Sequence, residues 1–168
     1  SAPTAVEGLY WVGMARILVI DDEEDVLRAL KRRFEREGWE VDLAESAAQA
    51  VEKIAQAEIP YDVVVTDMSM EAPQAGVQVL QAAFARDLFA QVIVMTAYGQ
   101  VANAVECMKR GAFDYIEKNR PGADVFEVLV GKIREALDER RRDIRMVSKW
   151  ERTAEFQRAR KQRRGSPS

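Results

Sequence analysis

The stretch RILVIDD (residues 16–22) decides the fold of this chain, because it contains a run of apolar residues that two aspartates directly follow. VVVTD (63–67) also ends on an aspartate, and DYIEK (114–118) ends on a lysine. Short apolar runs are typical of buried strands, and the carboxyl ends of parallel strands meet at one edge of a sheet, where ligands bind. The side chains that we expect to meet at that edge are Asp21, Asp22, Asp67 and Lys118.

The charge of this predicted edge favours a bound cation. Its aspartates outnumber its single lysine, and carboxylates that gather at one point repel each other unless a cation joins them. Carboxylate oxygens are the ligands that hard divalent metals prefer. Each aspartate also has a purely structural interpretation, because aspartates after strands commonly form turns or cap helices.

The rest of the pattern alternates between strands and helices. We expect strands at 16–20, 40–44, 63–66, 92–95 and 113–117, and helices at 24–37, 46–57, 76–85, 101–110 and from 124 onward. Ser46 and Asp124 are predicted helix N-caps, and Glu127 completes a capping box with Asp124. Gly38 is a predicted C-terminal stop. The order predicts an α/β fold, a doubly wound five-stranded parallel sheet with an extended C-terminal helix.

The composition restricts the class of protein. The chain has 168 residues, 48% of them hydrophobic, which suits one domain with appendages. It contains no histidine, which excludes histidine-ligated zinc, a catalytic triad with histidine and a histidine phosphocarrier. One cysteine, Cys107, cannot form an internal disulfide, so a cytoplasmic location is expected. No apolar stretch approaches the ~20 residues that span a bilayer, so membrane insertion is not expected.

Charge divides the chain into unequal parts. Residues 1–130 carry 12 basic and 22 acidic groups, whereas residues 131–168 carry 13 basic and 6 acidic groups. We predict an N-terminal extension or cloning remnant at 1–13, a domain at 14–137 and a basic helical tail or linker at 138–168.

The residues at the strand ends resemble the receiver domains of bacterial two-component response regulators. The resemblance covers roughly residues 16–137, and it rests on Asp21-Asp22, Asp67, Thr96-Ala97 and Lys118 in their order along the chain. The stretches TAYG (96–99) and GAFDY (111–115) are most similar to receivers of nitrogen-regulation-type activators. The resemblance implies the flavodoxin-like receiver fold, and it implies a signalling protein rather than an enzyme.

The resemblance also implies roles for individual residues. Asp67 would accept a phosphoryl group from a phosphohistidine on a sensor histidine kinase or a phosphotransfer protein. Lys118 and the Thr96 hydroxyl would contact phosphoryl oxygens. The implied Mg²⁺ ligands are Asp22, Asp67 and the backbone carbonyl of Ser69, with Asp21 acting through a metal-bound water. Tyr115 is either a switch residue that turns inward after Thr96 moves, or an aromatic at the edge of the core.

Two features depart from the family pattern. Receivers usually have a proline after the lysine, with a cis peptide bond, whereas here Asn119 follows Lys118. A cis bond before a residue other than proline costs about 3–4 kcal/mol, so the isomer is left open. The loop after Asp67 places Pro73 and Gly76 as if it held one extra residue.

The basic tail has three interpretations. The apolar positions Leu137, Ile144, Val147 and Ala154 fall near heptad spacing and favour a dimerising or signalling helix, although Arg140 and Glu151 interrupt them. An exposed linker is the second interpretation, and binding of an acidic surface or nucleic acid is the third. The sequence weighs against nucleic acid. Candidate homodimer surfaces are the fourth helix, the fifth strand, the fifth helix and the C-terminal helix.

Two rival functions stay open. A magnesium-dependent phosphohydrolase of the haloacid-dehalogenase type also uses aspartates after a strand, but it requires Asp-x-Asp where this chain has DDE (21–23). The second rival function is that of a degenerate receiver, which acts only as an interaction scaffold.

Overall fold

The computed structural model describes residues 13–68 and 74–165. Met14–Arg140 forms one compact unit, and the chain from Arg141 onward belongs to a second. None of the helices in the described part of the chain combines the length and apolar character that crossing a bilayer requires.

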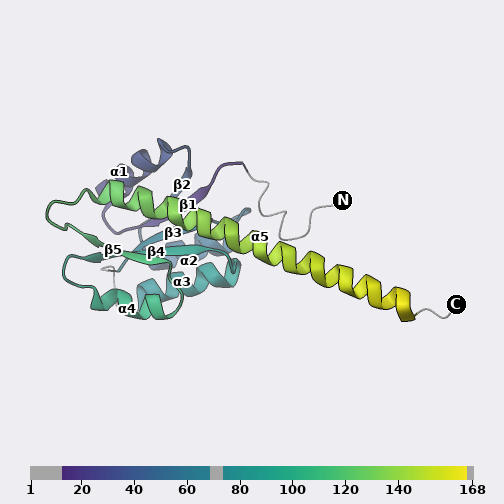
Figure 1. Cartoon of the computed structure of the whole chain (residues 1–168). Coiled ribbons are helices and arrows are strands. Elements are labelled where there is room, and N and C mark those ends of the chain that lie inside the picture. The colour runs from purple at the N-terminus through teal and green to yellow at the C-terminus, as the bar shows by residue number, and fades with distance from the viewer. Residues whose placement is uncertain (1–12, 69–73, 166–168) are drawn as a thin grey trace. The chain divides into compact units, whose positions relative to one another are not determined.

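Five parallel strands form the sheet of the compact unit, in the order β2-β1-β3-β4-β5 (Figure 1). The strands are β1 (Arg16–Ile20), β2 (Glu40–Ala44), β3 (Val63–Asp67), β4 (Gln91–Ala97) and β5 (Asp114–Lys118). Every residue of β3 is buried, as expected for a central strand covered by helices on both faces. The predicted doubly wound α/β fold is confirmed.

Helices cover both faces of this sheet. Their bounds are α1 (Glu24–Glu35), α2 (Ala47–Gln56), α3 (Ala75–Arg86), α4 (Ala102–Lys109) and α5 (Val125–Gly165). Side chains of α1 and the first part of α5, such as Leu30 and Ile133, pack in one core with β1, β3 and β4. Side chains of α2, α3 and α4, such as Ile54 and Leu80, pack in a second core on the opposite face.

Two predicted helix N-caps are confirmed, whereas α1 ends at Glu35, two residues before the predicted end of that helix. Ser46 Oγ accepts a hydrogen bond from Gln49 N at 3.1 Å, and Asp124 Oδ1 accepts one from Phe126 N at 3.0 Å. The second half of the predicted capping box is wrong, because the Glu127 carboxylate accepts from the Arg33 guanidinium of α1 instead. A charged partner outcompetes a backbone N–H because charge-assisted hydrogen bonds are stronger.

A buried ion cluster lies near the starts of the strands, away from the edge that carries the predicted site. Arg140 of α5 donates to Asp62 Oδ1 at 2.7 Å and to Asp87 Oδ2 at 2.9 Å. Its side chain is only 5% exposed. Asp62 also accepts from Arg16 N, and Asp87 accepts from Phe89 N. The residue that interrupts the apolar seam in the sequence therefore connects α5 to the segments before β3 and β4.

Candidate functional site

Three carboxylates converge at the carboxyl ends of β1 and β3. Asp21 and Asp22 directly follow β1, and Asp67 is the last residue of β3. One oxygen atom from each lies within 4.8 Å of the others. Asp21 and Asp67 are almost fully buried, whereas Asp22 is exposed. The group therefore has two interior carboxylates and one that faces solvent.

Lys118 completes the cluster from the end of β5. Its ammonium group donates to Asp21 Oδ2 at 2.7 Å and to Asp67 Oδ2 at 2.8 Å. The second oxygen of Asp21 accepts from Glu23 N at 2.9 Å, which also shapes the turn into α1. The structural interpretation of Asp21 as a turn former is thus correct, and it holds together with the contact to Lys118.

Burial and mutual attraction shift the ionisation of this cluster. Burial raises the pKa of Asp21, and the hydrogen bond and charge of Lys118 counteract only part of that effect. Burial lowers the pKa of Lys118, but its hydrogen bonds and charge interactions with Asp21 and Asp67 outweigh it, so the net pKa is raised. Lys118 is therefore held as the ammonium form, and one positive charge faces three carboxylates.

This donor set fits a hard divalent cation. The three carboxylates offer only oxygen ligands and lie close enough together to share one ion. Mg²⁺ binds such oxygens and retains waters in its remaining coordination positions. Ser69, the predicted carbonyl ligand, lies outside the described residues.

Thr96 and Tyr115 lie on neighbouring strands beside this cluster. Thr96 is buried in β4, and its hydroxyl donates to the Gln100 carbonyl at 2.8 Å. The loop that holds Gln100 is also tied to β5, because Gly99 N donates to the Glu117 carboxylate at 3.1 Å. Tyr115 is half-buried at the edge of the core. The Thr96 hydroxyl must leave the Gln100 carbonyl before it can donate to another group.

The peptide bond after Lys118 is trans, which answers the question that the sequence leaves open. Asn119 adopts a left-handed backbone conformation with φ of 56°. Asparagine tolerates this conformation better than most residues, so the loop can turn after β5 without the proline of the family pattern. Lys118 still contacts both buried carboxylates.

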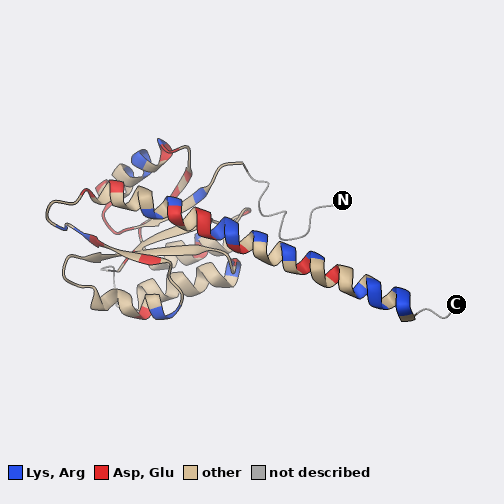
Figure 2. Ribbon diagram, in the orientation of Figure 1, with Lys and Arg blue, Asp and Glu red and all other residues tan. Residues whose placement is uncertain are grey.

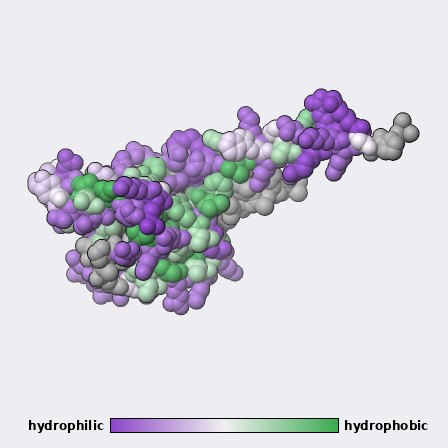
Figure 3. Space-filling model, turned by 90° about the horizontal axis from the view of Figure 1, so that it is seen from below, coloured by the Kyte–Doolittle hydropathy of each residue, from purple (hydrophilic) through white to green (hydrophobic). Residues whose placement is uncertain are grey.

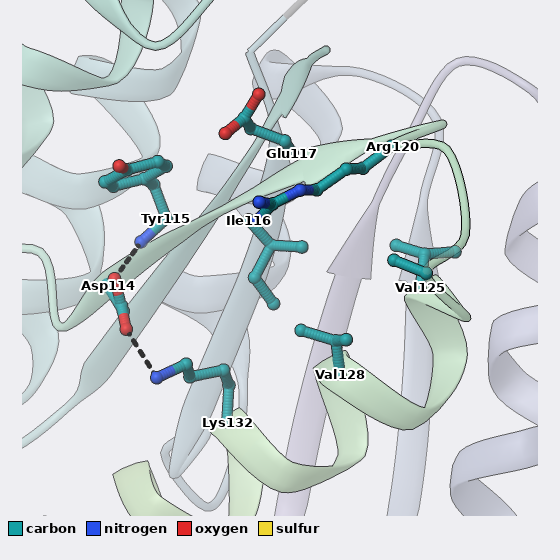
Figure 4. Close-up of a pocket in the computed structure, with 9 residues that line it drawn as sticks. Asp114, Tyr115, Ile116, Glu117, Arg120, Val125, Val128 and Lys132 are labelled. Carbon is teal, nitrogen blue, oxygen red and sulfur yellow. Dashed lines mark hydrogen bonds and ion pairs between the residues drawn. The ribbon is translucent and has the colours of Figure 1, made fainter.

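A pocket of about 280 Å³, which sequence reasoning did not find, lies between β5 and the first turns of α5 (Figure 4). Its lining includes Tyr115 and Glu117 of β5, Arg120 of the following loop, and Val128 of α5. At one end Lys132 bonds to Asp114 at 2.9 Å. The Tyr115 ring points away from α5 (Figure 4) and packs at the edge of the core that contains α4, so movement of this ring would affect the α4 side of β5.

Comparison with known proteins identifies the family. Residues 17–129 match the model of the response regulator receiver domain. The chain belongs to this family. It is therefore a receiver domain in two-component signalling. The family match does not identify the residues that react.

Individual relatives agree with this assignment. The acid tolerance regulatory protein ActR of Rhizobium meliloti (strain 1021) is 33% identical over 122 residues, which cover 73% of this chain and 61% of that protein. A response regulator described as NtrX-like from Rickettsia bellii (strain RML369-C) is 29% identical over 134 residues, covering 79% of this chain and 27% of that protein. The chain thus spans about three fifths of ActR and a smaller share of the NtrX-like relative.

A solved structure agrees as well. The crystal structure of a response regulator receiver domain protein from Clostridium thermocellum superimposes with a TM-score of 0.67 and 32% identity. The similarity covers 76% of this chain and 98% of that structure. The predicted family is confirmed at the levels of sequence and fold.

Proposed function

We propose that this receiver accepts a phosphoryl group on Asp67 from a phosphohistidine of a sensor histidine kinase or phosphotransfer protein. The observation that carries the proposal is the convergence of Asp21, Asp22, Asp67 and Lys118 at one sheet edge. A purely structural set of ion pairs would not need a third carboxylate that faces solvent beside two buried ones.

The transfer follows from the position of Asp67. A carboxylate oxygen of Asp67 attacks the phosphorus, a P–O bond forms, and the P–N bond to the donor imidazole breaks. The imidazole nitrogen keeps the electron pair of that bond and takes up a proton. Lys118 is already within 2.8 Å of Asp67, so its ammonium group can follow the new phosphoryl oxygens and neutralise part of their charge.

Asp22, Asp67 and the Ser69 carbonyl would hold Mg²⁺ directly, and Asp21 would contact it through water. When bound, the ion supplies positive charge that offsets repulsion between the attacking carboxylate and the anionic phosphoryl group. The chain's own contribution is to keep Asp21 and Asp67 buried and oriented by Lys118 before the donor arrives.

The response to phosphorylation begins at Thr96. A phosphoryl oxygen on Asp67 offers the Thr96 hydroxyl a charged acceptor in place of the Gln100 carbonyl, and charge-assisted hydrogen bonds are stronger than neutral ones. Movement of Thr96 would free space for the Tyr115 ring and alter the surface of α4, β5 and α5. That surface, or the C-terminal helix, would contact the next partner or a second copy in the cytoplasm.

Incubation with acetyl phosphate and Mg²⁺ tests the acceptor. Intact-mass analysis should show one added phosphoryl group on the wild-type chain and none on Asp67→Asn. The matched control is Asp25→Asn, because the Asp25 side chain is 95% exposed on α1 and lies outside the acidic cluster. Multiple turnover of phosphate esters would indicate a phosphohydrolase instead, and absence of both reactions would indicate a scaffold.

The role of Tyr115 needs a separate experiment. Nuclear magnetic resonance of the Tyr115 ring, with and without a fluoroberyllate mimic of the phosphoryl group, reports its rotamer populations. The switch predicts a shift toward the inward rotamer in the wild type and a smaller shift in Thr96→Ala. Unchanged populations in the wild type would remove Tyr115 from the signalling route.

A further inference from the structure

The part of α5 beyond the compact unit carries a charge opposite to that unit. Residues 141–168 contain ten basic and three acidic side chains, a balance of +7, whereas residues 14–140 have a balance of −9. The segment from Arg141 to Gly165 belongs to one continuous helix. The side chains of this segment can therefore be assigned to faces from the helical repeat.

Six of the ten basic side chains of this segment lie on one face. Intervals of three or four residues place them, together with Phe156, in one line along the helix. The line consists of Arg142, Arg145, Lys149, Arg152, Phe156, Arg160 and Arg163. All seven are exposed, and blue basic residues mark this part of α5 in Figure 2. We call this line the basic face.

The acidic side chains of the segment lie elsewhere. At about 100° per residue, Asp143, Glu151 and Glu155 are at least ~100° around the helix axis from Phe156. Arg158 and Lys161 lie on the side of the helix that carries these acidic residues, whereas the basic face holds no acidic side chain. The face is therefore a line of positive charge about 30 Å long, from 1.5 Å per residue. Such a line is complementary to a linear polyanion.

One exposed aromatic side chain interrupts this line. Phe156 lies within the basic face and is 60% exposed, whereas Trp150, which is 63% exposed, lies about 120° around the helix axis from Phe156. Figure 3 shows the distal part of α5 mostly in the purple of hydrophilic residues. An exposed aromatic ring between cations is an arrangement on which unpaired bases stack.

We propose that the basic face binds single-stranded nucleic acid, through its phosphates and through stacking of a base on Phe156. A duplex offers no unpaired base to the aromatic ring that lies in the middle of the cationic line. No contact with base edges is involved, so the binding is independent of base sequence. The sequence by itself weighs against the binding of nucleic acid by this chain. A count of charges does not show that six of them share one face of a continuous helix.

Two double variants of the full chain test the face. Arg160→Gln with Arg163→Gln removes two charges from the basic face. Arg158→Gln with Lys161→Gln removes two charges from the opposite side of the same turns, so net charge and position are matched. Binding to a fluorescein-labelled single strand of mixed sequence is measured by anisotropy at several salt concentrations, and helix content is checked by circular dichroism.

The first pair should weaken binding by about tenfold and reduce the slope of log K against log salt by about 1.4, at about 0.7 for each lost phosphate contact. The second pair should change binding less than about twofold. Phe156→Ala should weaken the single-strand complex by roughly tenfold, from the usual loss of one stacked base.

Equal losses in the two double variants would overturn the proposal, since net charge alone would then explain binding. Absence of single-strand binding at low salt would also overturn it. So would tighter binding to anionic phospholipid vesicles, or to a duplex of the same sequence. None of these results depends on phosphorylation of Asp67, so the two proposals fail independently.

Discussion

Replacement of Arg140 by methionine tests whether the buried ion cluster supports the fold. The substitution keeps an unbranched side chain of helix-forming character but removes the guanidinium that contacts Asp62 and Asp87. Removing one partner of a buried ion pair usually costs about 3–5 kcal/mol, because the remaining charge stays buried without compensation. Each carboxylate keeps one backbone hydrogen bond, to Arg16 N or Phe89 N. We therefore expect a loss of about 3 kcal/mol.

The free energy of unfolding is measured by urea denaturation and monitored by circular dichroism and by the fluorescence of Trp39. This side chain is 8% exposed and packs against Phe34. The control is Arg134→Met on the same helix. Arg134 is 60% exposed, and Glu37 keeps its pairing with Arg33, so a change below about 1 kcal/mol is expected.

Asp87→Asn in the Arg140→Met background makes the test sharper. The amide removes the uncompensated charge from a side chain that is 4% exposed, so the double variant should regain part of the lost stability. A loss in Arg140→Met no larger than in Arg134→Met, or no recovery in the double variant, would refute the reasoning.

Three further predictions concern the site and its surroundings. Asn119→Pro should destabilise the protein by more than about 1 kcal/mol, because proline fixes φ near −65° where the structure has 56°, whereas Asn119→Gly should be nearly neutral in the same urea titration. Lys118→Met should cost about 3 kcal/mol in magnesium-free buffer, because Asp21 and Asp67 lose their shared cation. Added Mg²⁺ should restore more stability to this variant than to the wild type, and absence of any Mg²⁺ stabilisation in both proteins would contradict the metal assignment. Ser46→Ala should cost about 1 kcal/mol in thermal unfolding, with Ser46→Asn as a control that keeps a cap.

The site could be predicted from the sequence because its signals are local. Each of Asp21, Asp67 and Lys118 stands at the end of an apolar run, and the parallel sheet brings those ends together wherever the connecting helices lie. The sequence pattern does not predict which carboxylates the Lys118 ammonium group contacts. Its contact with Asp21, as close as that with Asp67, depends on the turn after β1.

The contacts of α5 were missed because their partners lie far away in the sequence. Arg140 is 78 residues from Asp62 and 53 from Asp87, and no local pattern links such positions. A weak signal existed, since Arg140 occupies an inward position of an apolar seam, where a charge needs a buried partner. The sequence predicts a local cap for Glu127 for the same reason, although its partner Arg33 is 94 residues away.

The two charged clusters of this receiver show why burial of carboxylates alone does not identify a reactive site. Around Arg140, each carboxylate bonds to the guanidinium through one oxygen and to a backbone N–H through the other, and the arginine is almost fully enclosed. Around Lys118, a third carboxylate, Asp22, remains exposed beside two buried ones. An incoming phosphoryl donor or a cation can approach the second cluster from solvent, whereas the first would have to open before it could bind anything. Accessibility together with excess charge therefore distinguishes the end of the sheet that we propose to react from the end that holds α5 in place.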